Sequence, residues 1–179
     1  AVNGGFDLEK TWGSYSINTK ANIGPNDGKK YSLNDKIFIK KSDTKNIIKR
    51  KINYIYSPDN IIRIIKGTNF HYFSKDAIDK FFNEDFLITN LVDRMGMRLK
   101  GPKLENIVST NIKSEGLVRG VIQVPADGNP IIMLSDHGTV GGYPKIGVVI
   151  TADLDFAGQL TPGTKIKFKE VSLEEAQNI

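Results

Sequence analysis

The chain has 179 residues, of which 39% are hydrophobic and 25% are charged, a composition typical of a globular protein rather than a disordered one. It contains no cysteine, which excludes disulfides, thiolate metal sites and thiol nucleophiles. The formal net charge is +5, but the basic run from Lys40 to Lys51 has no interleaved aromatic residues, which favours a solvated linker over a nucleic-acid interface.

The sequence shows no membrane or export signal. No apolar run approaches the roughly 20 residues of a membrane-spanning helix, and the opening AVNGGFDLEK lacks the basic and apolar regions of a signal peptide. We therefore expect a soluble, cytoplasmic protein that contacts no membrane. The chain begins at Ala1 rather than at a methionine, and we interpret it as starting inside a longer protein.

Short apolar runs between turn residues predict strands. In chain order they are KIFIKK (36–41), NIIRIIKG (60–67), FLITNLV (86–92), GVIQVP (120–125), PIIMLSD (130–136), IGVVITAD (146–153) and KIKFKEV (165–171). No long amphipathic helix separates them, so the pattern favours an antiparallel sheet or barrel over a parallel βαβ array.

The best helix candidate lies within GTNFHYFSKDAIDKFF (67–82). Ser74 can cap it, and Asp76 falls in its first turn, where the helix dipole favours an anion. We expect this helix to plug one end of the sheet, because its apolar residues share one face. These residues are Ala77, Ile78, Phe81 and Phe82.

Two shorter helical features and a lobe boundary complete the outline. A helical turn is expected after Thr151, and Ser172 with Glu175 has the spacing of a capping box. The SPDN turn follows the basic run and precedes a strong predicted strand. We therefore expect a strand-rich end of an N-terminal lobe (1–45), a basic linker (46–59) and a barrel domain (60–179).

The segment DRMGMRLKGP (93–102) holds two arginines beside glycines. Guanidinium groups bind carboxylate or phosphate through paired hydrogen bonds, so Arg94 and Arg98 suit an anion. The alternative is that Asp93 pairs locally with an arginine and that the segment is a β-bulge or corner.

The segment SEGLVRGVIQVPADGNP (114–130) also carries polar groups. Ser114 and Glu115 would point to opposite faces of a strand, which disfavours a nucleophile and base pair. Glu115 and Gln123 are better candidates for hydrogen bonds to a ligand. PADGNP has the residue types of a turn, so a plain hairpin remains equally open.

The stretch SDHGTVGGYPK (135–145) has more glycine than a connecting turn needs. Its glycines let backbone amides approach a ligand, while Asp136, Thr139 and Lys145 add a carboxylate, a hydroxyl and a cation. The spacing is neither that of a P-loop nor that of a dinucleotide fingerprint. His71 and His137 lack carboxylates at metal-ligand spacing, so we expect no metal site.

The segments AVNGGFDLEKTWGSYS, IIRIIKGTNF, DRMGMRLKGP and SEGLVRG through TPGTKIKF occur in the same order as in the allophanate hydrolase subunit 2 family, which the chain resembles over nearly its whole length. That family includes a subunit of bacterial 5-oxoprolinase, an antagonist of a sporulation-kinase inhibitor, and part of the carboxyltransferase domain of urea carboxylase. The chain resembles roughly the last two-thirds of these proteins, without their GRPG-type opening segment.

The resemblance implies a mainly β fold with a few short helices, a cyclophilin-like β-barrel. It also implies a partner of the allophanate hydrolase subunit 1 type and a small amide substrate. One branch implies an ATP-dependent hydrolase subunit that opens 5-oxoproline to glutamate. The alternatives are carboxyl transfer from the biotin of a partner to urea-like amides, or a non-catalytic regulatory subunit that binds a kinase-inhibitor-type partner.

The family motif also suggests site residues. Those expected to be catalytic are Asp136, Lys145 and Glu115, and those expected to bind substrate are Arg94, Arg98, Gln123, Thr139, Gly141, Gly142 and Tyr143. The chain departs from the family turn DRQTTGGYPK at His137, Gly138 and Val140, and Tyr15 stands where the family has an arginine. These changes remove polar groups that would otherwise help to define the substrate.

Overall fold

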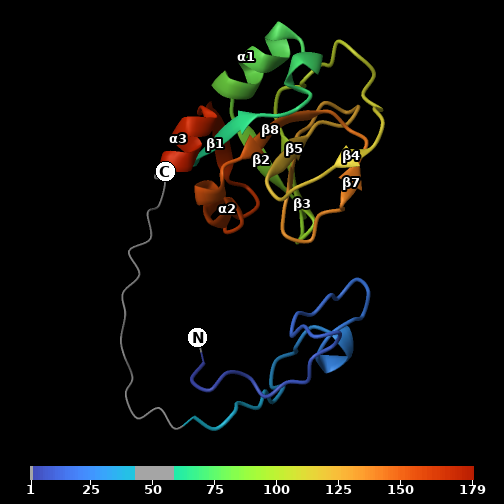
Figure 1. Ribbon diagram of the computed structural model, residues 1–179, viewed down its shortest axis with the longest axis vertical. Helices are drawn as coiled ribbons and strands as arrows, with labels where there is room; N and C mark the ends of the chain where they lie inside the picture. The colour runs from blue at the N-terminus through green and yellow to red at the C-terminus, as the bar shows by residue number, and fades with distance from the viewer. Residues whose placement is uncertain (1, 43–58) are drawn as a thin grey trace. The chain divides into compact units, whose positions relative to one another are not determined.

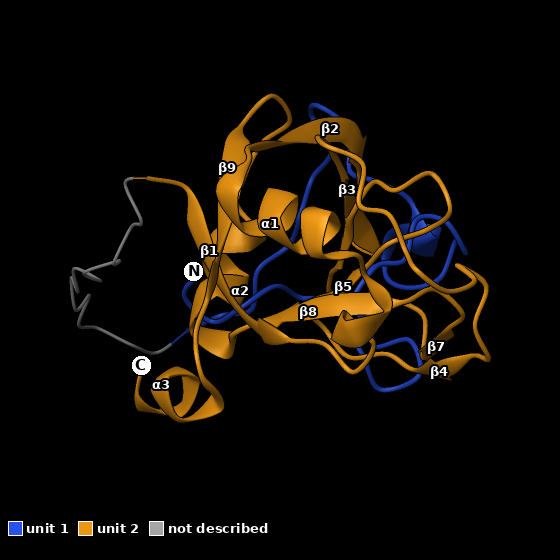
Figure 2. Cartoon of the chain, turned by 90° about the horizontal axis from the view of Figure 1, so that it is seen from above, with its two compact units in different colours: residues 1–53 blue, residues 54–179 orange. Residues whose placement is uncertain are grey.

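The computed structural model describes residues 2–42 and 59–179. The chain divides into two compact units, Ala1–Asn53 and Tyr54–Ile179 (Figure 2). The predicted linker at 46–59 falls almost entirely outside the described residues, and the expected lobe boundaries stay a prediction.

The described part of the first unit is built from turns. It contains the 3-10 helix η1 (Asn26–Gly28) and isolated bridges such as Phe6 with Ile39. The predicted strand at 36–41 is wrong: only Ile39 of this run forms a bridge. An apolar run becomes a strand only when a neighbouring strand pairs with it along its length, and the described residues supply none here.

Seven strands of the second unit's described residues close into a barrel (Figure 1). Their order is β1-β8-β5-β6-β3-β2-β9, and every pair is antiparallel except β1 with β9. The strands are β1 (Ile61–Lys66), β2 (Phe86–Val92), β3 (Gly96–Lys100), β5 (Val121–Gln123), β6 (Ile131–Met133), β8 (Lys145–Val149) and β9 (Lys165–Glu170). The predicted β-barrel is thereby confirmed.

Alternating side chains fill the barrel. In β1 the buried residues are Ile62 and Ile64, and in β3 they are Met97 and Leu99. Successive side chains of a strand point to opposite faces. The alternating burial therefore shows that one face of each strand points into the barrel. The resulting hydrophobic core lies entirely within the second unit.

Helix α1 (Lys75–Asn83) covers one end of the barrel, as predicted, and lies across its opening in Figure 2. The side chain of Ser74 accepts a hydrogen bond from the amide of Ala77 at 3.1 Å, which satisfies one otherwise free donor of the first turn. Phe81 is fully buried and stacks on Phe168 of β9, with ring centroids 4.5 Å apart. Residues Phe70–Tyr72, upstream in the predicted helical stretch, form only the 3-10 turn η2.

Two further helices follow the predicted positions. In α2 (Thr151–Ala157) the carboxylate of Asp153 accepts hydrogen bonds from the backbone amide of Arg63 at 2.7 Å and from its guanidinium, which ties α2 to β1. Helix α3 (Leu173–Asn178) begins with the expected capping box of Ser172 and Glu175. None of the helices among the described residues has the length and hydropathy needed to cross a membrane.

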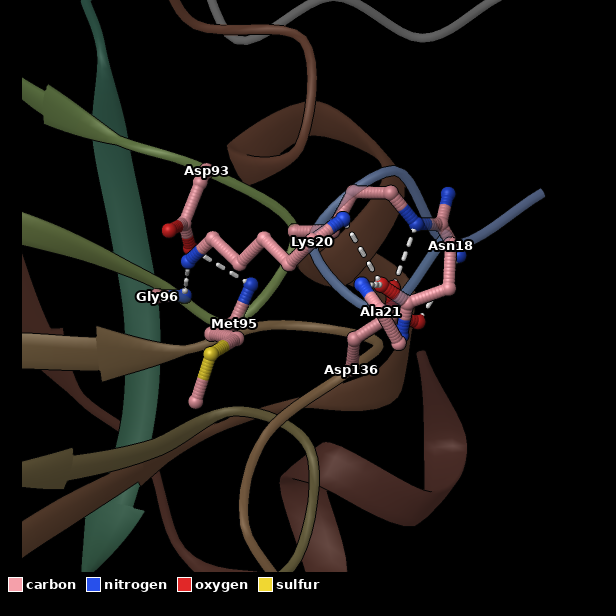
Figure 3. Close-up of polar contacts among 8 residues, drawn as sticks. Asn18, Lys20, Ala21, Asp93, Met95, Gly96 and Asp136 are labelled. Carbon is pink, nitrogen blue, oxygen red and sulfur yellow. Dashed lines mark hydrogen bonds and ion pairs between the residues drawn. The ribbon is translucent and has the colours of Figure 1, made fainter. Parts of the chain in front are cut away.

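Two hairpins shape the surface that carries the candidate site. β5 and β6 pair around the PADGNP turn, which confirms that hairpin. β2 and β3 pair around a turn in which the Asp93 carboxylate accepts hydrogen bonds from the amides of Met95 at 2.7 Å and Gly96 at 3.2 Å (Figure 3). The segment at 93–102 is therefore a tight turn followed by a strand, and Asp93 stabilises the turn itself.

Candidate active site

The glycine-rich stretch at 135–145 lies beside the stretch that carries Glu115. β4 (Glu115–Gly116) and β7 (Val140–Gly141) form a small two-stranded sheet in which Glu115 faces Gly141. The amide of Leu117 donates to the carbonyl of Thr139 at 3.0 Å and extends this pairing. Two segments singled out separately in the sequence are thus brought together by backbone hydrogen bonds.

Lys145 begins β8 and is buried, with its side chain 5% exposed. Its ammonium group forms an ion pair with Glu115, whose side chain is 44% exposed. The hydrogen bond from Lys145 lowers the pKa of Glu115 below its usual range; burial opposes this shift, while the Lys145 charge and a hydrogen bond from Asn69 add to it. Glu115 is therefore kept ionised, and its partly exposed carboxylate pairs with the buried ammonium of Lys145.

Asn69 completes this polar cluster from the segment between β1 and α1. Its side chain is buried, and its Oδ1 accepts a hydrogen bond from the backbone amide of Lys145 at 3.1 Å. Buried polar groups need such partners because an unpaired one costs the full loss of hydration. Asn69 thus fixes the start of β8 and contacts Glu115.

Gln123 ends β5 and is 3% exposed. Its Nε2 donates to the carbonyl of Tyr143 at 3.1 Å, and its Oε1 accepts no hydrogen bond from the described residues. A Cβ at Gly141 would lie 2.7 Å from that Nε2, so a side chain at this position would have to displace Gln123. Gln123 therefore has one side-chain acceptor, Oε1, that accepts no hydrogen bond from the described residues, and its side chain packs closely against Gly141.

A cavity of about 520 Å³ lies over β2, β3 and β6 and reaches Gln123 and Tyr143. Its apolar wall consists of Leu91, Val92, Met95, Ile131 and Met133, and its polar groups include Asn90, Asp93, Arg98, Gln123 and Tyr143. The guanidinium of Arg98 forms no ion pair with a carboxylate of the described residues. A cavity with an apolar wall and a few convergent polar groups is the usual form of a small-molecule site.

Arg94 and Asp136 bind each other. The Nε of Arg94 lies 2.7 Å from Asp136 Oδ2 and its second terminal nitrogen 2.9 Å from Oδ1. The hydrogen bonds from Arg94 lower the pKa of Asp136 despite an opposing effect of burial. This two-point pair joins the β2–β3 turn to the loop after β6.

The structure divides the predicted site residues into groups. Arg98, Gln123 and Tyr143 line the cavity, whereas Asp136, Lys145, Glu115 and Arg94 form the two ion pairs outside its lining. Thr139, Gly141 and Gly142 belong to the β4–β7 region. Their roles in binding and catalysis stay predictions.

Sequence reasoning missed Asn69 and two methionines of the cavity wall, Met95 and Met133. The only available signal for Asn69 was an amide between an apolar strand and an aromatic run. Met95 lies in the β2–β3 turn and Met133 in β6, and neither a turn motif nor strand alternation tells which side chains border a cavity. In the part of the chain that the structure describes, no three His, Asp or Glu side chains gather as a metal site requires.

Comparison with known proteins adds independent findings. Residues 1–170 match the family model described as carboxyltransferase domain, subdomain A and B. The chain is 35% identical over 176 residues to a 5-oxoprolinase subunit of Escherichia coli K12, covering 98% of this chain and 56% of that protein. It is 26% identical to urea amidolyase of Saccharomyces cerevisiae over 99% of this chain and 11% of that protein.

The fold has a solved counterpart. The crystal structure of Kluyveromyces lactis urea amidolyase superposes with a TM-score of 0.83 at 25% identity, over 99% of this chain and 12% of that one. The chain spans little more than half the length of the 5-oxoprolinase subunits it matches, 56% and 57%.

Proposed function

The chain belongs to the family of carboxyltransferase domains, subdomains A and B, and from this premise we propose that it is part of a 5-oxoprolinase-type hydrolase subunit. The proposed reaction opens the cyclic amide of 5-oxoproline to glutamate and consumes ATP. The observation that carries the proposal is the 35% identity to the Escherichia coli 5-oxoprolinase subunit over 98% of this chain.

The large cavity suits such a substrate. A lactam with a carboxylate offers an apolar ring face, an N–H donor and an anion. The cavity offers the apolar wall, the open Oε1 acceptor of Gln123 and the guanidinium of Arg98. We assign Arg98 to the carboxylate and Gln123 to the amide N–H, because a guanidinium pairs with an anion and the Oε1 of Gln123 can accept a hydrogen bond from an N–H.

The ion pairs would act beside the bound amide. Hydrolysis joins a water oxygen to the amide carbon, breaks the C–N bond and delivers a proton to the nitrogen. We assign Glu115 to orient the attacking water, since Lys145 keeps it ionised and its side chain is 44% exposed. Arg94 holds Asp136 as a second, ionised carboxylate, which we assign to orient a donor group of the substrate.

ATP and the partner belong to the assembled enzyme in this proposal. The sequence has no P-loop spacing, so we assign the consumption of ATP to the complex and not to a glycine loop of this chain. The proposed partner is a protein of the allophanate hydrolase subunit 1 type.

Carboxyl transfer is the second candidate, and the match to urea amidolyase with a TM-score of 0.83 favours it. In that reaction the carboxylated biotin of a partner would supply the carboxyl group. Gln123 and Arg98 would then orient a urea-like amide so that its nitrogen attacks. The apolar wall with Met95 and Met133 suits the uncharged ring of biotin as well as a lactam.

The test uses the full-length protein mixed with the subunits encoded beside it. We expect ATP-dependent formation of glutamate from 5-oxoproline that disappears when this subunit is omitted. Arg98→Gln should raise KM at least about tenfold, since a hydrogen-bonded charge is lost, whereas Lys75→Gln, an exposed change on α1, should leave KM unchanged. A stable complex that is inactive on 5-oxoproline, yet carboxylates urea with a biotinylated partner, would replace the hydrolase with the transferase.

A complex that acts on neither substrate would contradict both catalytic proposals. It would leave the regulatory subunit that binds a kinase-inhibitor-type partner as the remaining alternative, and a pull-down of that partner would then test it.

A further inference from the structure

Asn69 is a buried polar residue to which the proposed function gives no role. The other buried polar or charged residues among those described are Gln123, Lys145 and Asp153. The proposed function uses Gln123 and Lys145, and Asp153 ties α2 to β1. Asn69 is 4% exposed. A buried amide is costly unless its donors and acceptor are paired, so the partners of Asn69 indicate what it does.

The segment that carries Asn69 is mounted directly on the start of β8. The amide of Gly67 donates to the carbonyl of Ile146 at 3.0 Å, and the amide of Asn69 donates to the carbonyl of Lys145 at 3.3 Å. A Cβ at Gly67 would lie 2.3 Å from the carbonyl oxygen of Lys145, closer than a carbon and an oxygen can approach without a bond. The two backbones are therefore in contact, and the position of Asn69 follows that of Lys145.

The side chain of Asn69 has one allowed orientation. Its Oδ1 accepts hydrogen bonds from the backbone amide of Lys145 at 3.1 Å and from the hydroxyl of Thr68 at 3.5 Å. Its NH2 group donates to the carboxylate of Glu115. Exchanging the two ends would turn the oxygen toward the carboxylate and the NH2 group toward an N–H, and both contacts would be repulsive.

Glu115 needs a second contact to have a fixed direction. It lies on the two-residue strand β4, and its side chain is 44% exposed. The ammonium of Lys145 holds its charge, but an ammonium is a compact point charge and sets no plane for the carboxylate. The NH2 group of Asn69, itself held by the backbone of Lys145, supplies a second point. Two contacts from different directions fix a carboxylate that one ion pair would leave free to turn.

The backbone at 143–145 connects this carboxylate to the large cavity. The carbonyl of Tyr143 accepts a hydrogen bond from Gln123 Nε2 at 3.1 Å, and the carbonyl of Pro144 accepts one from the amide of Val124 at 3.0 Å. Asn69 holds the same stretch through the amide of Lys145. Gln123 and Glu115 are thus referred to one short piece of backbone, Gln123 directly and Glu115 through Asn69.

We propose that Asn69 is a positioning residue, whose amide fixes the direction of the Glu115 carboxylate relative to the backbone that Gln123 holds. This role rests on the proposed function, which assigns the attacking water to Glu115 and the substrate amide to Gln123. Asn69 acts through Glu115 and Lys145 and not through the substrate. Its loss should therefore impair the chemical step, which depends on the geometry of the reacting groups, more than the binding of substrate.

The first experiment measures kcat and KM of Asn69→Asp in the assembled complex with 5-oxoproline and ATP. Aspartate keeps an oxygen for the amide of Lys145 but replaces the donor to Glu115 with a second oxygen. We expect kcat to fall at least about tenfold, the effect of one lost hydrogen bond to a charged group, while KM stays nearly unchanged. Asn178→Asp makes the same charge change on the exposed α3 and should leave both constants unchanged. An unchanged kcat, or a raised KM, in Asn69→Asp would overturn the proposal.

The second experiment needs neither turnover nor a variant of Asn69. Lys145 and Asn69 are the side chains that act on the Glu115 charge. In NMR spectra of the whole chain, the side-chain amide protons of Asn69 should therefore shift with pH at the same midpoint as the carboxyl carbon of Glu115. Those of Asn178 serve as the reference, and Glu115→Gln should abolish the shift at Asn69. An Asn69 signal that does not follow Glu115 would contradict the contact, even in an active enzyme.

The two experiments separate the failure of this role from the failure of the proposed function. An inactive wild-type complex contradicts the proposed function and removes the catalytic role of Asn69 with it. An active complex in which Asn69→Asp behaves like Asn178→Asp contradicts the positioning role alone. Should Asn69→Asp fail to fold, the titration of the wild-type chain decides whether Asn69 holds Glu115.

Discussion

Burial gives Lys145 a different role from that of an exposed lysine. Its side chain is 5% exposed, and Glu115 is its ion-pair partner. Removing one partner of a buried pair leaves an uncompensated charge, which is strongly destabilising. A substitution at Glu115 would leave the buried ammonium of Lys145 uncompensated and would therefore alter folding as well as chemistry.

Glu115 should make stability depend on pH. Its pKa is lowered in the folded state, so its contribution is complete above the unfolded pKa and is lost as pH falls through the folded pKa. We expect Glu115→Gln to reduce the free energy of unfolding at neutral pH by more than the ~1 kcal/mol of an exposed pair, because it leaves the buried ammonium of Lys145 uncompensated. The difference should shrink as pH falls below about 4.3.

Urea denaturation of both proteins across this pH range measures the effect. Glu174→Gln, on the exposed first turn of α3, is the control for a general loss of negative charge. A constant difference between the wild type and Glu115→Gln at every pH would contradict the assigned ion pair.

Gly141 and Gly138 form a matched pair of glycines in one loop. A Cβ at Gly141 would lie 2.7 Å from Gln123 Nε2 and 2.9 Å from Leu117 Cδ1, whereas one at Gly138 would meet only the carbonyl of Val140 at 3.4 Å. Gly141→Ala should displace Gln123 and cost about 1–3 kcal/mol of stability, while Gly138→Ala should be near neutral. Thermal unfolding of the two variants measures this, and equal effects would refute the close packing.

At the scale of elements, a helix cap contributes more to the free energy of unfolding when its helix buries core side chains. α1 buries Ala77 and Phe81, whereas α3 has no buried residue. Ser74→Ala should therefore lower the free energy of unfolding by about 1 kcal/mol, and Ser172→Ala should lower it much less, because α3 can fray without exposing the core. Equilibrium denaturation of the two variants is the measurement. A larger loss for Ser172→Ala would mean that α3 packs more firmly than its exposure indicates.

Strand prediction succeeded where an apolar run had a partner. The runs that contain β1, β2 and β9 alternate and lie in the barrel. The run at 36–41 has the same pattern but only one bridge. Short strands such as β4 gave no signal, because two residues cannot show a period and their pairing depends on a segment far along the chain.

At the scale of the molecule, the core belongs to one unit. Every residue of the hydrophobic cluster lies between Ile62 and Phe168. A fragment containing Tyr54–Ile179 should therefore fold and unfold cooperatively, with a midpoint within about 5 °C of the whole chain. Circular dichroism melting compares the two. A fragment without a cooperative transition would show that Ala1–Asn53 contributes essential contacts.

The sequence by itself determined the local features of this protein. Strand alternation, the Ser74 cap, the Ser172 capping box and the ordered motifs that identify the family all depend on residues near one another in the chain. It also identified Arg98, Gln123 and Tyr143 as candidates, since they lie within recognisable motifs.

Only the tertiary structure decided which candidates meet. The pairing of β6 with both β3 and β5 places Arg98 and Gln123 on either side of Ile131, and the β4–β7 pairing places Glu115 near Lys145. Likewise, the pairing of Arg94 with Asp136 depends on a neighbour that no local pattern encodes. The physical reason is that strand periodicity fixes which side of a strand a residue occupies, whereas strand order and register fix what lies opposite it.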